Sequence, residues 1–283
     1  MLARSMQRRH ACAVLLAAGL VVPPAAGAQP GSAPSSGSLR ISLEQRTRVE
    51  TIADHYRPDD TGATRVLALR SRIRVQAGQP TGWLTAELEF QDARGLQTDA
   101  AFVDPADRVN ELDVLQAALR LRTPTDTAGP RVALDVGRLT LDLGSRRLSA
   151  RNGMRNTTNA FDGAVLRLDV SAGTVRAFLT RPVLVDTTKL DSSTKGGLFW
   201  GGLLRRGLDP RVTAEGYYLG LHDDASFGTA RRQFSTAGGR LRVAPQPRVV
   251  DGEVEAVWQH GRLGHLDHAA SFLHIQLGYT LDG

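Results

Sequence analysis

Apolar and polar residues alternate along most of this chain with a period of two. Residues 84–91, for example, read LTAELEFQ, and the same alternation marks residues 39–48, 67–76 and 115–122. Side chains on a β-strand point to opposite faces in turn, so this period predicts strands with one apolar and one polar face. No segment shows a convincing helical period. The pattern therefore predicts an all-β, antiparallel fold.

Further alternating runs extend the prediction to about twelve strands, mostly of about 9–11 residues, which is the span of a tilted transmembrane strand. These runs are residues 132–136, 165–170, 175–180, 198–205, 212–221, 234–243, 249–259 and 272–279. Long polar connections alternate with short ones. The long ones are residues 54–64, 94–111, 143–161, 186–196 and 221–233, and the short ones lie near 78–82, 124–130, 171–174, 206–211 and 245–248. A membrane barrel with extracellular loops and periplasmic turns has this organisation.

The N-terminus indicates export from the cytoplasm. Three arginines, Arg4, Arg8 and Arg9, precede the apolar stretch 11–22, and Ala26-Gly27-Ala28 supplies a small-residue cleavage pattern. Residues 1–28 are therefore predicted to be a signal peptide, followed by a flexible Pro/Gly/Ser linker at residues 29–38. No later stretch reaches the ~18 apolar residues of a membrane-spanning helix, so residues 39–283 would cross a bilayer only as strands.

Charge and cysteine content narrow the class of protein further. The only cysteine, Cys12, lies in the predicted signal peptide, so the mature chain would contain no disulfide. Loss of the three signal-peptide arginines lowers the net charge from +6 to +3, and Lys189 and Lys195 are the only lysines. Export argues against a nucleic-acid partner, and an arginine-rich surface instead suits an anionic substrate.

Together these features favour an outer-membrane β-barrel, because in lipid a sheet must leave no backbone edge unpaired. The partner of the apolar faces would be outer-membrane lipid. Aromatic residues that suit the interfacial girdles of such a barrel are Trp200, Tyr217, Tyr218, Trp258 and Tyr279.

Two stretches resemble the alginate export family of outer-membrane β-barrels. One is Arg46-Thr47-Arg48-Val49-Glu50 with Arg70-Ser71-Arg72-Ile73-Arg74. The other runs from Gly137-Arg138-Leu139 through Gly144-Ser145-Arg146-Arg147 to Asn159-Ala160-Phe161-Asp162-Gly163. The resemblance covers the chain from about residue 39 to its end. It implies an eighteen-stranded barrel whose arginine-lined bore passes an anionic polysaccharide outward, with periplasmic export machinery as a further partner. Since only about twelve strands precede Gly283, we expect the chain to be truncated at its C-terminus.

The arginines support the same function by their chemistry. Guanidinium groups bind carboxylates bidentately and keep their charge, and a polyuronate carries one carboxylate per sugar. Gly137 is expected to form a bulge or to redirect the chain there. The predicted pore-lining, substrate-binding residues are Arg46, Arg48, Arg70, Arg72, Arg74, Arg120, Arg122, Arg138, Arg146, Arg147, Arg151 and Arg155. Under an alternative interpretation, these charges pair with acidic residues across strands and only fill the lumen.

The leading hypothesis is therefore a channel that exports an anionic polysaccharide such as alginate. An anion-selective porin for small solutes and a surface interaction barrel are the alternatives. A barrel hydrolase is disfavoured because no histidine is followed two residues later by serine. We expect no enzyme activity, cofactor or catalytic metal.

Overall fold

Strands that follow one another along the chain pair as neighbours in an antiparallel sheet. The computed structural model describes residues 38–53, 63–79, 81–97, 109–124, 129–187, 189–226 and 230–281. Within these ranges there are thirteen strands and no helix. They are β1 (Leu39–Ala53), β2 (Ala63–Ala77), β3 (Leu84–Gln97), β4 (Asn110–Arg122), β5 (Arg131–Leu139), β6 (Phe161–Val170), β7 (Gly173–Leu184), β8 (Ser192–Ser193), β9 (Leu198–Gly207), β10 (Val212–Asp223), β11 (Arg232–Val243), β12 (Val250–Leu263) and β13 (Leu266–Tyr279).

The predicted all-β, antiparallel fold is confirmed, and so is the number of strands. Twelve strands have nine to fifteen residues, and the two-residue β8 pairs only with β7. The other strands follow the order β1 to β7 and then β9 to β13. Eighteen strands in a complete barrel stay a prediction. The predicted signal peptide and nearly all of the predicted linker lie outside the described residues.

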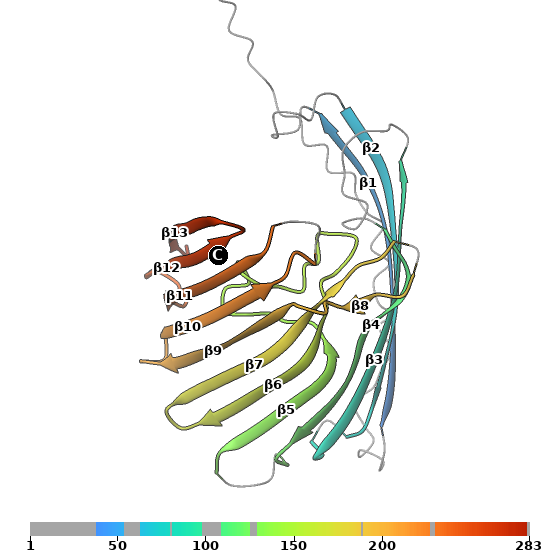
Figure 1. The fold of residues 1–283 in the computed structure, drawn as a ribbon. Coiled ribbons are helices and arrows are strands. Elements are labelled where there is room, and N and C mark those ends of the chain that lie inside the picture. Colours follow the sequence, from blue (N-terminus) through green and yellow to red (C-terminus); the bar gives the residue numbers. More distant parts are fainter. Residues whose placement is uncertain are drawn as a thin grey trace, which may run out of the picture.

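The sheet curls so that β1–β4 face β9–β13, with β5–β7 forming the wall between them (Figure 1). Up to β9, the connections after β1, β3, β5 and β7 have nine or more residues, and those after β2, β4 and β6 have eight or fewer. Strand direction reverses at each step, so the turns after β2, β4, β6, β9 and β11 lie at one end of the sheet, which we call the short-turn end. The predicted alternation is therefore present up to β9 but not beyond it, because the connection after β10 has eight residues, as many as the one after β4, and only two residues join β12 to β13 at the opposite end.

The β6–β7 hairpin fixes which residues of its two strands lie opposite one another. Its turn is only two residues long, and Gly173 follows it with φ +144°. A Cβ atom on Gly173 would lie 2.2 Å from the carbonyl oxygen of Arg205, so both the backbone conformation and the close strand approach require glycine. This hairpin places Arg167 directly opposite Arg176.

The expected bulge at Gly137 is not where the sheet is irregular. Pairing of β5 with β4 and β6 is continuous through Gly137, whereas the register shifts lie between β3 and β4 around Phe90. Gly137 instead has φ +130°, and a Cβ there would lie 2.2 Å from the carbonyl oxygen of Ala117. Glycine is required at this position because the neighbouring strand approaches closely, and not because a bulge inserts an extra residue into the strand.

The two faces of the sheet differ sharply in polarity. Large apolar side chains cover the outer face, where Leu43 (77 % exposed) is opposite Ile73 (46 %). The concave face carries charged and polar groups, among them Arg72 and Glu89, which are both buried. An apolar outside and a polar inside are what a lipid-embedded barrel requires. Within the described ranges, no helix has the length and apolar character to cross a membrane.

The aromatic residues divide between the two faces. Trp200 and Tyr218 pack together on the outer face with ring centroids 5.9 Å apart, and Trp258 is 61 % exposed. Tyr279 is also exposed. Tyr217, in contrast, is buried on the concave face, so its assignment to a girdle was wrong. Neighbouring residues of one strand point to opposite faces, and only one of the two tyrosines can face lipid.

Candidate functional site

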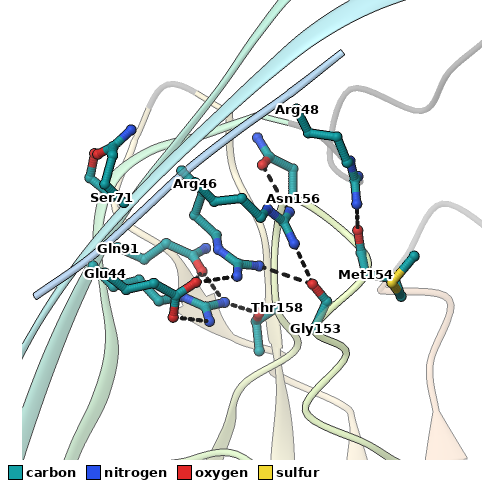
Figure 2. Close-up of polar contacts among 12 residues, drawn as sticks. Glu44, Arg46, Arg48, Ser71, Gln91, Gly153, Met154, Asn156 and Thr158 are labelled. Atoms are coloured by element: carbon teal, nitrogen blue, oxygen red, sulfur yellow. Dashed lines mark hydrogen bonds and ion pairs between the residues drawn. The ribbon is translucent and has the colours of Figure 1, made fainter. Parts of the chain in front are cut away.

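Residues 140–160, which join β5 to β6, fold into the space enclosed by the sheet; we call them the inward segment. One end of this segment is held by β1 (Figure 2). Arg46 donates a hydrogen bond from Nη2 to the carbonyl oxygen of Arg155 at 2.8 Å and another from Nη1 to that of Gly153. Arg48 donates to the carbonyl oxygen of Met154. Guanidinium donors thus satisfy backbone acceptors that would otherwise require water.

Strand β2 adds a second layer of contacts to the same end. Arg70 donates to the carbonyl oxygen of Arg155 at 3.0 Å and is paired with Glu44. Arg72 contacts Thr158 Oγ1 at 2.5 Å. Asn156 is buried and donates from Nδ2 to the carbonyl oxygen of Leu69 at 2.9 Å. These bonds hold the segment in place because opening them would leave buried polar groups with fewer hydrogen-bond partners.

The other end of the inward segment is held by the opposite wall. Arg147 forms ion pairs with Glu253 at 2.6 Å and with Glu255 at 2.5 Å, both on β12. Glu255 is only 1 % exposed and also accepts hydrogen bonds from Ser145 (3.0 Å) and from the hydroxyl of Tyr217 (2.8 Å). The segment therefore bridges two walls that are far apart in the sequence.

Apolar packing seats the middle of the segment on the sheet. Leu141 is fully buried and Leu143 is 4 % exposed. Their cluster also contains Leu139, Val165, Phe178, Tyr217, Leu219 and Val257. Beside it, Arg151 pairs with the buried Glu89 through two hydrogen bonds, one of them 2.9 Å long. Burial of several large apolar side chains, at about 1.5–3 kcal/mol each, gives the segment a fixed position.

The twelve predicted arginines fall into two groups. Those that tie the inward segment to the sheet, or lie in it, are Arg46, Arg48, Arg70, Arg72, Arg146, Arg147, Arg151 and Arg155. The others lie along the wall. Arg74 pairs with Glu87, Arg120 with Asp135 and Arg138 with Asp162, while Arg122 donates to the Gly82 carbonyl and to Thr85.

Ion pairs with neighbouring strands therefore occupy five of these twelve guanidinium groups. The alternative interpretation foresaw such pairing, and it applies to Arg70, Arg72, Arg74, Arg120 and Arg138. Which arginines contact a transported anion stays a prediction. An arginine that is already bound to a buried carboxylate or a backbone carbonyl is a poorer ligand for an incoming anion than one that is not.

A second connection, residues 185–197, is attached to β4 by a pair of carboxyl groups. Asp191 accepts a hydrogen bond from Asn110 Nδ2 at 2.8 Å, and its backbone N–H donates to Asp113 Oδ2 at 2.5 Å. Burial, together with a hydrogen bond and charge repulsion from Asp113, raises the pKa of Asp191 to about 7. Arg138 lies 3.7 Å from Asp113 and donates to the Asp191 carbonyl oxygen at 3.2 Å. Asp186 donates its backbone N–H to Asp191 at 2.8 Å.

A cavity lies between the inward segment and the short turns; we call it the vestibule. Its volume is about 550 Å³. Its charged lining comprises Arg120, Arg122, Arg131, Arg167, Arg176, Arg205, Asp135, Asp142, Asp169 and Glu215. Six arginines and four carboxylates make it electropositive. Among the described residues, no group of three or more histidine, cysteine, aspartate or glutamate side chains is placed to hold a metal ion.

Four of these vestibule arginines were missed by the sequence analysis. Arg131, Arg167, Arg176 and Arg205 are spread singly over strands and form no dense motif. A usable signal was nevertheless present. The turn near Ala172-Gly173 was recognised, and counting back along the two strands from that turn puts Arg167 opposite Arg176.

A lipid-suited outer face, a charged interior and a segment folded across that interior define an outer-membrane β-barrel channel. The particular family follows from the sequence. Residues 38–283 match the family model described as alginate export, so the chain belongs to the alginate export family. It is therefore an outer-membrane channel protein and not an enzyme, as the resemblance in the sequence implied. No curated protein matches the chain in sequence.

Among solved structures, the fold is similar to OccAB4 and OccAB1 of Acinetobacter baumannii and to OccD3 (OpdP) of Pseudomonas aeruginosa. Sequence identities are 14 %, 12 % and 10 %, and TM-scores are 0.46, 0.48 and 0.40, respectively. The alignments cover 85 %, 80 % and 84 % of this chain. They cover 68 %, 52 % and 60 % of the three solved chains, so this chain spans half to two thirds of their length.

Proposed function

We propose that this protein conducts an anionic polysaccharide of the polyuronate class outward across the outer membrane. The observation that carries the proposal is the electropositive vestibule at the short-turn end, which in outer-membrane barrels faces the periplasm. A polymer leaving the cell meets this end first. Membership of the alginate export family supports a polyuronate as the cargo.

The inward segment favours one alternative, an anion-selective porin for small solutes. The segment is bound to β1 and β2 at one end and to β12 at the other, so it narrows the passage. A narrow passage admits a single extended sugar chain but also suits small anions. The two functions differ in the length of solute that passes.

The deciding experiment measures flux of uronates from vesicles that contain the full-length protein. We expect a long oligouronate to leave faster than a neutral maltooligosaccharide of the same length, because guanidinium groups attract the carboxylates along its chain. Release of a monouronate without release of the long oligomer would favour the small-solute porin. Equal release of charged and neutral oligomers would contradict both functions.

A further inference from the structure

A row of side chains that carries arginines without carboxylates crosses the wall of the vestibule. The register of the sheet pairs Arg122 with Ala133, Ala133 with Arg167, Arg167 with Arg176, and Arg176 with Leu203. All five residues line the same cavity. The row therefore holds three guanidinium groups from β4, β6 and β7 and no acidic group.

The next row toward the short turns is different, because its charges compensate one another. It runs through Arg131, Asp169, Thr174, Arg205 and Glu215, in which cationic and anionic side chains are interspersed. Glu215 lies 3.5 Å from Arg205. Directly opposed unlike charges stabilise a sheet, and directly opposed like charges destabilise it. The Arg167–Arg176 pair is thus an unfavourable arrangement in the protein by itself.

The carboxylates nearest to this pair are already engaged. Asp169 binds Arg167 at 2.9 Å. Asp135 binds Arg120 in a bidentate manner, with distances of 2.5 and 2.8 Å. Arg176 donates to the backbone carbonyl oxygen of Asp142 at 2.6 Å. Within the part of the chain that the structure describes, neither Arg122 nor Arg176 forms an ion pair with a carboxylate.

We propose that Arg122, Arg167 and Arg176 form a carboxylate-binding subsite of the vestibule, which takes the uronate groups of the polymer as they enter from the short-turn side. This inference rests on the proposed function and identifies where the polymer is first bound. A guanidinium presents two parallel N–H donors to a carboxylate, and the cavity volume of about 550 Å³ is within the usual range for small-ligand sites.

The subsite arginines differ from those that hold the inward segment in the number of donor nitrogens already in use. Arg46 and Arg70 each use both terminal nitrogens, and Arg72 binds Gln91, Thr158 and Glu44. Those contacts position the segment. Arg167 uses Nε for Asp169 and Arg176 uses Nη1 for the Asp142 carbonyl oxygen, whereas Arg122 uses Nε and Nη2 for Gly82 and Thr85. Among the contacts of the described residues, both terminal nitrogens of Arg167 and Nη2 of Arg176 are therefore left for a ligand. In the vestibule, the neighbouring acidic groups keep binding weak enough for release, which conduction requires.

The test uses the full-length protein in a planar bilayer with trigalacturonate as the probe, added to one side at a time. The variants are R167Q, which removes one charge of the pair, and R176K, which keeps the charge but loses the planar fork. R242Q is the matched control. Arg242 lies on β11 near the same end of the sheet, is exposed, and does not line the vestibule. Heat-modifiability confirms folding of each variant.

We expect trigalacturonate to block the current at lower concentration from the short-turn side, and maltotriose not to block it. R167Q is expected to raise the blocking concentration about tenfold and R176K by a smaller factor, while R242Q leaves it unchanged. Equal effects of R167Q and R242Q would show that block depends on the overall electrostatic field of the pore and not on these particular arginines, which would overturn the subsite. Block that is unaltered in both R167Q and R176K would also overturn it, with the channel function intact. A wild-type protein that selects cations and is not blocked would refute the proposed function itself.

Discussion

Simultaneous replacement of Arg46 and Arg70 by glutamine is expected to release one end of the inward segment. The two guanidinium groups share the carbonyl oxygens of Gly153 and Arg155 as acceptors. A hydrogen bond from a charged donor contributes about 1.5–3 kcal/mol, so loss of two such acceptor sites weakens this anchor by about 3 kcal/mol. That free energy corresponds to a rise of about a hundredfold in the population of the detached state.

Single-channel recording of the full-length protein measures the consequence. A detached segment moves within the conducting path, so we expect added current noise and a higher-conductance level that the wild type lacks. R40Q is the control, because Arg40 lies on the same strand and is exposed. Both variants should remain heat-modifiable, since the strand ladders are untouched. Wild-type conductance and noise in the folded R46Q/R70Q variant would refute the role of these arginines as an anchor.

Two further predictions concern pH and backbone geometry. Burial and Asp113 raise the pKa of Asp191 to about 7, above its ordinary 3.8. The attachment of residues 185–193 is therefore strongest at low pH and weakens as the pH rises through about 7. Protease accessibility of this segment should increase over that range in the wild type and lose its pH dependence in D191N. Replacement of Gly137 by alanine should lower the unfolding temperature in detergent, at a cost of about 1–3 kcal/mol for the strained backbone alone, whereas alanine at Gly216, where a Cβ meets nothing within 4 Å, should change it little.

The strands and their connections could be predicted because they depend on local pattern. Side-chain alternation marks a strand wherever one face meets lipid and the other does not, and no distant contact is needed to recognise it. The alternation of long and short connections follows from the same reading. Tyr217 and Tyr218 show the limit of this approach. The sequence places the two tyrosines on opposite faces of the strand. Which of these faces points toward Glu255 depends on how the whole sheet curls.

The course of the inward segment could not be predicted, because its anchors are far away in sequence. Residues 143–161 were recognised as a long polar connection. Nothing local in them shows that Gly153 lies beside Arg46, or that Arg147 lies beside Glu253. Arginine-rich motifs attracted the functional interpretation, although several of these arginines hold the protein together. Which charges pair over long distances in the sequence depends on how the sheet curls in three dimensions. The alternation of apolar and polar residues carries no information about that curling.

The anchors of the inward segment also constrain the order in which the protein matures. Arg46 and Gly153 are 107 residues apart, and Ser145 and Glu255 are 110 residues apart, on opposite sides of the segment along the chain. Closure of loops of this length is entropically costly and slow, whereas each hairpin of the sheet forms from neighbours. We therefore expect the wall to assemble first, and the segment to acquire its second anchor only after β12 has arrived. On this order the nascent pore is wider than the finished one, and its final narrowing belongs to assembly.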